Sequence, residues 1–149
     1  MAAQTAELSR RIFEDVWNGK NLNAIDDLMS ADYVHHDAGS IAANGPEGYK
    51  QFVKSYMNAF PDAHFSIEDE FTAGQNNDVQ TEVTRWSITG THGGELAGIP
   101  PTGRRISITG ISIARVANGK ITESWNNWDA LGLMQQLGVV AAESKGRAA

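Results

Sequence analysis

Apolar residues in the first part of the chain recur at intervals of three and four, a spacing that predicts amphipathic helices. The segment from Thr5 to about Lys20 has this pattern, and Asn21–Met29 repeats it in a shorter form. A third helix is expected to start at Gly45-Pro46, because proline fits the first helical turn, and to stop at Phe60-Pro61-Asp62. The residues Asp32–Asp37 read as extended chain.

Beyond Asp62 the period changes to two, and Val, Ile, Thr and aromatic residues predominate, which is typical of strands. The predicted strands are His64–Thr72, Asp78–His92, Arg104–Val116 and Lys120–Trp128. Asn76-Asn77 and Asn118-Gly119 mark turns, the second with the composition of a two-residue type I′ hairpin. Helices followed by an antiparallel sheet predict an α+β fold. We expect one domain over residues 1–140 and a flexible tail over residues 141–149.

The Asn118-Gly119 turn also predicts how the last two strands pair. With these as the loop residues, the register pairs Val116 with Ile121, Ala114 with Glu123, Ser112 with Trp125, Gly110 with Asn127 and Ile108 with Asp129. Side chains alternate across a strand, so Trp125, Asn127 and Asp129 are expected on one face, opposite mostly small residues. A bulge in the hairpin would shift this register.

Composition excludes several classes of partner and site. The formal net charge is −6 and Lys and Arg never run longer than a pair, so nucleic acid and anionic membrane are poor partners. The chain has no cysteine, which excludes disulfides, thiolate metal ligands and a cysteine nucleophile. No apolar run has the length of a membrane span or the character of a signal peptide, so we expect a cytoplasmic location.

One carboxylate stands where the last strand gives way to a short amphipathic helix. Asp129 follows Trp125 and Trp128, and the helical pattern begins at Ala130. Apolar rings beside a carboxyl group raise its pKa and suit it to general acid or base catalysis. Aspartate is also a favoured helix N-cap. This segment alone leaves both roles open.

Short motifs along most of the chain follow one another in an order typical of a known family. They are Tyr33-Val34-His35-His36-Asp37, Phe60-Pro61-Asp62, Gly90-Thr91-His92, Gly98-Ile99-Pro100-Pro101-Thr102-Gly103 and Gly119-Lys120-Ile121, followed by Glu123, Trp125, Asp129, Leu133, Gln136, Leu137 and Gly138. From about Ile12 to Gly138, the chain therefore resembles the SnoaL-like polyketide cyclases (ester cyclases), which belong to the nuclear-transport-factor-two-like superfamily.

The resemblance implies a cone-shaped α+β barrel, in which N-terminal helices pack in the concave face of a curved, mostly antiparallel sheet and close a deep apolar pocket. Cyclases of this family perform an intramolecular aldol ring closure on a polyketide methyl ester, without metal or cofactor. The resemblance also implies an acid/base role for Asp129. We therefore expect a cofactor-independent enzyme that uses Asp129 on a small, mostly apolar carbonyl or polyketide-like compound.

Other residues are expected to assist. Asn127, on the same predicted face, could donate a hydrogen bond to an enolate oxygen. His35 and His36 are adjacent in an extended segment and point to opposite faces, so they make a poor metal pair, and one of them should face the pocket. The family spacing of tyrosine and histidine falls on Tyr33 and His36, which favours His36. The expected pocket wall contains Tyr33, His35, Phe60, Trp86 and Trp125.

Several alternatives stay open. The pocket could bind a small molecule without turnover, because no clear second catalytic group accompanies Asp129. Limonene-epoxide-hydrolase-like proteins use an Asp-Arg-Asp set, in which Asp129 and Arg85 would match two members while Ser87 stands at the third. An isomerase of the same fold needs only one basic carboxylate with hydrogen-bond donors. A homodimer is expected through the outer sheet face, which would carry Thr109, Ile111, Ile113 and Trp128.

Overall fold

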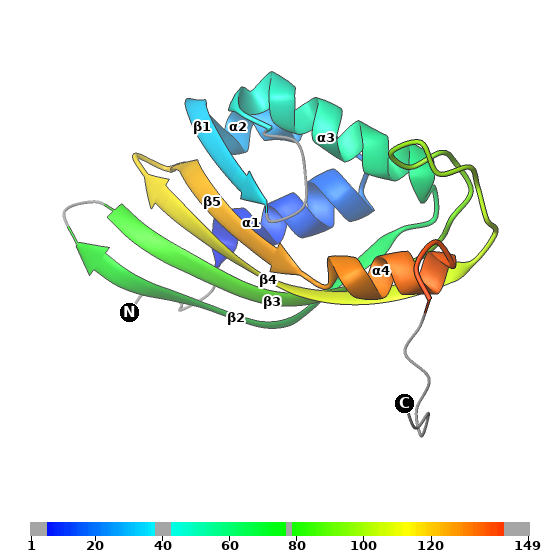
Figure 1. Ribbon diagram of the computed structural model, residues 1–149. Coiled ribbons are helices and arrows are strands. Elements are labelled where there is room, and N and C mark those ends of the chain that lie inside the picture. The colour runs from blue at the N-terminus through cyan, green and yellow to red at the C-terminus, as the bar shows by residue number, and fades with distance from the viewer. Residues whose placement is uncertain (1–5, 38–42, 77–78, 142–149) are drawn as a thin grey trace.

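The computed structural model describes residues 6–37, 43–76 and 79–141, and it has the predicted α+β architecture (Figure 1). The helices are α1 (Glu7–Arg11), the π-helical η1 (Ile12–Asn18), α2 (Ala24–Leu28), α3 (Gly45–Ala59) and α4 (Ala130–Leu137). The strands are β1 (Met29–Asp37), β2 (His64–Asn76), β3 (Val79–Thr91), β4 (Arg105–Ala117) and β5 (Lys120–Trp128). Residues 142–149 of the predicted tail, and Asn77 of the predicted Asn76-Asn77 turn, lie outside the described residues.

The five strands form one curved sheet in the order β1-β5-β4-β3-β2. β1 runs parallel to β5, and all the other neighbours are antiparallel. α1 and α3 lie on the concave side of this sheet, and α4 follows the end of β5 and contacts β4 (Figure 1). The main core fills the space between helices and sheet. None of the helices in the described ranges is long and apolar enough to cross a membrane.

The helices occur where they were predicted, but the first changes its geometry and the second is shorter. The first predicted helix is α1 continued by η1, whose wide turns bury Ile12, Phe13, Val16 and Trp17. α2 is shorter than predicted at both ends, because Leu22 and Asn23 form a turn before it and Met29 is already extended and begins β1. α3 begins and ends as predicted, with Pro46 in its first turn. The concave face therefore receives a continuous apolar surface from the N-terminal helices.

The hairpin between β4 and β5 begins as predicted and then departs from the prediction. Asn118 and Gly119 have φ angles of 54° and 74°, as a type I′ turn requires. Val116 pairs with Ile121 as expected, but Arg115 then pairs with Glu123, which leaves Thr122 as an extra residue in β5. This is a β-bulge, and it moves every later residue of β5 by one position.

The bulge reverses the predicted faces of β5. Ser124, Asn126 and Trp128 line the concave side, whereas Trp125 and Asn127 do not. The predicted pairing of Ser112 with Trp125 is wrong, since Ser112 pairs with Asn126. A physical reason is burial: Ile121 is 2% exposed, and unbroken alternation from it would also have turned the Glu123 carboxylate into the core.

Candidate active site

A cavity of about 120 Å³ lies between the N-terminal helices and the concave face of the sheet. Its walls are mostly apolar, and rings from every layer of the fold contribute to them. The aromatic lining residues are Phe13, Trp17, Tyr33, Tyr49, Phe52, Tyr56, Phe60, Phe65, Trp86 and Trp128. Mostly apolar concave sites with a few placed polar groups are where small molecules bind in proteins.

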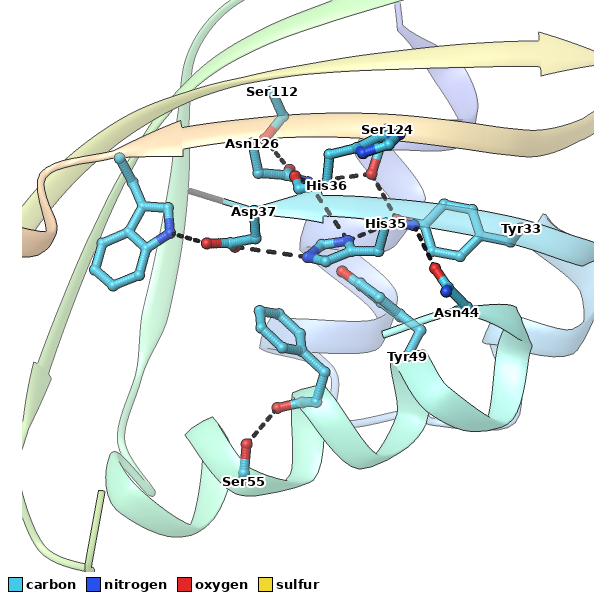
Figure 2. A network of polar contacts seen from close by, with 12 residues as sticks. Tyr33, His35, His36, Asp37, Asn44, Tyr49, Ser55, Ser112, Ser124 and Asn126 are labelled. Carbon is cyan, nitrogen blue, oxygen red and sulfur yellow. Dashed lines mark hydrogen bonds and ion pairs between the residues drawn. The ribbon is translucent and has the colours of Figure 1, made fainter. Parts of the chain in front are cut away.

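Most polar groups of the cavity gather on one wall, where β1 lies beside β5 (Figure 2). Tyr33, His35 and Asp37 alternate along β1, so their side chains share the concave face. Ser124 and Asn126 reach the same place from β5, at the positions that pair with His35 and Asp37. The parallel pairing of these two strands therefore assembles the polar wall.

Hydrogen bonds run across this wall in one direction. Trp86 Nε1 donates to Ser112 Oγ at 2.9 Å, and Ser112 Oγ donates to Asn126 Oδ1 at 2.7 Å. The amide of Asn126 is thereby oriented, with Nδ2 donating to Ser124 Oγ at 3.1 Å and to the His36 carbonyl at 3.2 Å. An indole N–H can only donate, so it fixes the direction of the bonds that follow.

The series of hydrogen bonds continues in the same direction to His35. Ser124 Oγ accepts from Asn126, which leaves its own hydrogen for the Tyr33 hydroxyl, 2.5 Å away. Tyr33 can then donate to His35 Nδ1 at 2.8 Å. A neutral His35 that accepts at Nδ1 carries its hydrogen on Nε2, and Nε2 lies 3.5 Å from Asp37 Oδ2. The network therefore directs an N–H toward the Asp37 carboxylate.

Asp37 supplies the carboxylate that lines the cavity. Its side chain, like that of His35, is 3% exposed. Trp128 Nε1 donates to Asp37 Oδ1 at 2.9 Å, and His35 faces the other carboxylate oxygen. Among the described residues, no other Asp or Glu and no Lys or Arg lines the cavity. Three or more His, Asp or Glu side chains placed for a metal ion do not occur within the described ranges.

Two tyrosines of α3, Tyr49 and Tyr56, line the same cavity as this carboxylate. Burial, with a contribution from the Asp37 charge, raises the pKa of Tyr56 to about 12. Burial likewise raises the pKa of Tyr49, whose hydroxyl accepts from Trp17 Nε1 at 3.0 Å. No acceptor for the Tyr49 hydroxyl hydrogen occurs among the residues that the structure describes. Both hydroxyls are therefore neutral hydrogen-bond donors at physiological pH.

The raised pKa of Tyr56 predicts a loss of stability in alkali. In the unfolded chain Tyr56 ionises near its ordinary pKa of 10, but in the folded protein it ionises only near 12. Its stabilising contribution is thus fully present below pH 10 and is lost as the pH rises toward 12. Tyr56→Phe should make the decline in the free energy of unfolding shallower over this range. Urea titrations of both proteins below and above pH 10 measure it, and equal slopes would contradict it.

The sequence matches one protein family over most of its length. The profile of the SnoaL-like polyketide cyclases matches residues 7–137. The chain belongs to the SnoaL-like polyketide cyclase family. Among curated relatives, it is 31% identical over 139 residues to the aklanonic acid methyl ester cyclase DnrD of Streptomyces peucetius, covering 89% of either chain. DauD of Streptomyces sp. strain C5, with the same activity in its name, is also 31% identical, covering 89% of this chain and 80% of its own.

Solved structures agree with this assignment. A protein from Acidithiobacillus ferrooxidans, provisionally assigned as a polyketide cyclase, is 29% identical, with a TM-score of 0.75, over 95% of this chain and 100% of its own. A SnoaL-like protein from Jannaschia sp. CCS1 superimposes with a TM-score of 0.79 over 94% of this chain and 97% of its own. At 19% identity, that second likeness speaks for the fold alone.

Within this SnoaL-like fold, four of the five predicted wall residues line the cavity, namely Tyr33, His35, Phe60 and Trp86. Trp125 does not, because the bulge turns it outward. There it stacks on His36, with ring centroids 5.2 Å apart, and Arg115 lies over its ring.

The three residues predicted to act in catalysis lie outside the cavity lining. Asp129 is exposed, and its Oδ1 accepts from Gly132 N at 2.9 Å, so it caps α4. His36 is also on the outer face, with Nε2 2.7 Å from Glu123 Oε2. Asn127 is exposed. The preference for His36 over His35 as the pocket histidine is therefore wrong, and a catalytic role for Asp129 stays a prediction.

Two of the open alternatives are affected by the same geometry. Arg85 is exposed and does not line the cavity, so the Asp-Arg-Asp set of the epoxide hydrolases is not assembled in it. The outer sheet face exposes Ile111 and Ile113, as expected, but Trp128 lines the cavity instead. The homodimer stays a prediction.

The sequence reading missed Asp37, Ser112, Ser124, Asn126 and Trp128 as pocket residues. A signal for Asp37 was present, because Tyr33, His35 and Asp37 stand at alternate positions of a predicted strand. For Ser124, Asn126 and Trp128 no such signal existed, since their facing depends on the bulge at Thr122.

Proposed function

We propose that this protein is a cofactor-independent cyclase that closes a ring by an intramolecular aldol reaction on a polyketide-like carbonyl compound. The observation that carries the proposal is a buried carboxylate, Asp37, set in an apolar cavity that the neutral side chains of Tyr49 and Tyr56 also line. Membership of the SnoaL-like family supports the reaction class, and the names of DnrD and DauD describe cyclases.

In this mechanism Asp37 is the base. One of its oxygens removes a proton from the carbon next to a substrate carbonyl, and the electron pair of that C–H bond moves into an enolate. The enolate carbon then attacks a second carbonyl carbon of the same molecule, which forms the new C–C bond and leaves an alkoxide. The protonated Asp37 returns its proton to this alkoxide, so the enzyme ends the cycle unchanged.

The surrounding groups lower the cost of the charges that form. Tyr49 and Tyr56, kept neutral by burial, are suited to donate hydrogen bonds to the enolate and alkoxide oxygens. Trp128 Nε1 holds the carboxylate of Asp37 in place, and His35 Nε2 lies 3.5 Å from its other oxygen. Fixed donors in an apolar cavity stabilise charge better than water can, because they need no reorganisation during the reaction.

Asp37 thus takes the place that the sequence analysis assigned to Asp129. Asp129 is exposed and engaged with Gly132, while Asp37 is buried inside the cavity. His35, on the same wall as Asp37, takes the supporting place assigned to His36. The non-catalytic interpretation, a binding protein with the same cavity, differs from the proposal in one measurable step, the removal of the carbon-bound proton.

If the protein removes a proton from the carbon next to a carbonyl, it should also catalyse the exchange of that hydrogen with solvent. Methyl 2-oxocyclohexanecarboxylate, an uncharged one-ring β-ketoester, should exchange the hydrogen between its two carbonyls for deuterium faster with the protein than in buffer. Nuclear magnetic resonance in D₂O follows the loss of this signal, and the protein-dependent rate should saturate with ester concentration. Heat-unfolded protein at the same concentration is the control. A rate equal to that control would favour the binding protein instead.

A further inference from the structure

Asn126 determines which ring nitrogen of His35 carries the hydrogen. The Tyr33 hydroxyl, 2.8 Å from His35 Nδ1, can donate to this nitrogen or accept from it, so that contact alone fits either tautomer. The amide nitrogen of Asn126, 3.4 Å from Nδ1, can only donate. A hydrogen on Nδ1 would face the hydrogens of that amide. The neutral ring therefore carries its hydrogen on Nε2.

The orientation of the Asn126 amide is fixed from both of its ends. Nδ2 donates to the backbone carbonyl of His36 at 3.2 Å, and a carbonyl can only accept. Oδ1 accepts from Ser112 Oγ at 2.7 Å, and Ser112 is itself the acceptor for Trp86 Nε1. An amide turned the other way would place its oxygen against the His36 carbonyl and leave both without a donor. The amide nitrogen therefore stays on the side of His35.

The tautomer of His35 determines what faces the Asp37 carboxylate. His35 Nε2 lies 3.5 Å from Asp37 Oδ2, and both side chains are 3% exposed. With the hydrogen on Nε2, the ring directs an N–H group at the carboxylate and favours its charged form. The other tautomer would direct a lone pair at the same oxygen and favour the protonated acid. Because the interior has a low dielectric constant, this difference has a large effect.

Groups from three elements surround the His35 ring, and Asp37 is the charged one among them. From β1 they are Tyr33 and Asp37, from β5 Ser124 and Asn126, and from α3 the rings of Tyr49 and Phe52, with centroids 5.5 and 4.8 Å from that of His35. Both tyrosines are neutral, because burial raises their pKa. Since Nε2 already carries a hydrogen and Nδ1 faces donors, His35 has no free position for a proton from the substrate. Asp37 is therefore the proton acceptor on this wall.

We propose that Asn126 is a positioning residue that keeps His35 in the Nε2–H tautomer, so that Asp37 stays ionised and takes up the proton from carbon. Asn126 acts through His35 rather than on the reacting atoms. The tautomer follows from the contacts of Asn126 itself, whereas the transfer of the proton to Asp37 rests on the proposed function. Two different measurements therefore test the two parts, and the first involves no turnover.

Nitrogen-15 nuclear magnetic resonance of the full chain shows the tautomer directly, because the two nitrogens of a neutral imidazole resonate at well separated frequencies. We expect Nε2 of His35 to carry the hydrogen at neutral pH. Assignment through the backbone resonances of His35 separates this ring from that of His36. A hydrogen on Nδ1, or a mixture of both tautomers, overturns the proposal, because Asn126 would then not exclude the second form.

Asn126→Asp and Asn127→Asp form a matched pair of variants. Both replace an amide of β5 by a carboxylate, but Asn126 lines the cavity, whereas Asn127 is exposed and does not. In Asn126→Asp an acceptor faces Nδ1, so His35 should take up a hydrogen there. In Asn127→Asp the Nε2–H form should remain. An unchanged ring in Asn126→Asp means that other groups determine the tautomer, which contradicts the proposal. The unsubstituted protein still decides the tautomer if Asn126→Asp does not fold.

The pH dependence of hydrogen exchange separates positioning from a purely structural role. With methyl 2-oxocyclohexanecarboxylate, the protein-dependent rate should rise in one step, as Asp37 ionises. In Asn126→Asp the rate at neutral pH should fall about tenfold, because an imidazolium makes Asp37 a weaker base, and the ionisation of His35 should add a second step. Asn127→Asp should keep the single step and a rate within about twofold of the original.

The same profile in both variants, or two steps in the unsubstituted protein, overturns the link between Asn126 and Asp37. Absence of protein-dependent exchange in all three proteins contradicts the proposed function instead. In that case the resonance measurement still decides whether Asn126 determines the tautomer of His35.

Discussion

Asp37→Asn is expected to lower the protein-catalysed exchange of the carbon-bound hydrogen by about 10²–10⁴-fold, the range that a positioned general base contributes. The amide has nearly the shape of the carboxylate and can still accept from Trp128 Nε1, which holds Asp37 Oδ1 at 2.9 Å. It cannot take up a proton from carbon at neutral pH. Exchange rates with methyl 2-oxocyclohexanecarboxylate measure the effect, and calorimetry with the same ester checks that the cavity is intact.

Asp129→Asn is the matched control and decides between the two carboxylates. Asparagine caps helices about as well as aspartate, so the contact with Gly132 N and the stability of the protein should be kept. The exchange rate should then stay within about twofold of the original. A loss comparable to the one expected for Asp37, together with full activity in Asp37→Asn, would return the role of base to Asp129.

Much of the architecture could be predicted from the sequence because it depends on local rules. The change from a helical period to a period of two locates the boundary between helices and sheet near Asp62, where β2 soon begins. Asn118-Gly119 forms the predicted type I′ turn because both residues tolerate positive φ. Pro46 marks the first turn of α3 for a reason equally local, its fixed φ.

Which side chains of β5 point to the concave face could not be predicted, because a single extra residue reverses the alternation. Strand side chains alternate with a period of two, so the extra Thr122 turns every later side chain to the opposite face. The error reached Trp125, Asn127 and Asp129 together, since all three were placed by counting from the turn. The predicted face of β5 was the outer one, and the side chains that line the cavity near the end of this strand are those of Ser124, Asn126 and Trp128.

The preference for His36 over His35 as the pocket histidine was wrong for a different reason. Alternation shows that His35 and His36 point to opposite faces, but not which face is concave. That depends on the parallel pairing of β1 with β5, a contact between segments about ninety residues apart in the chain, since His36 pairs with Trp125. Tyr33 and Asp37 share the concave face with His35, so the pattern of three polar residues at alternate positions was the more informative signal.

The sequence patterns also did not predict that Glu82 of β3 is buried, where its carboxylate binds the first turn of α1. Glu82 is fully buried, and its two oxygens accept from Leu8 N at 3.3 Å and Ser9 N at 2.8 Å. These are among the first N–H groups of α1, which have no partner within the helix. The residue before α1, Ala6, has no side chain that could cap it. Glu82 therefore acts as an N-cap supplied from another part of the chain.

Glu82→Ala should lower the free energy of unfolding by about 3 kcal/mol, because two buried N–H groups lose a charged acceptor and a void remains. Glu82→Gln is the matched control, since its amide oxygen can still accept from Ser9 N, and it should lose less than half as much. Urea titration measures both. Ser9, Ile12 and Phe13 line the cavity, so the alanine variant should also bind methyl 2-oxocyclohexanecarboxylate more weakly. Equal losses in the two variants would contradict this prediction, because glutamine keeps the volume of Glu82 and one acceptor oxygen. The stabilisation would then require both carboxylate oxygens.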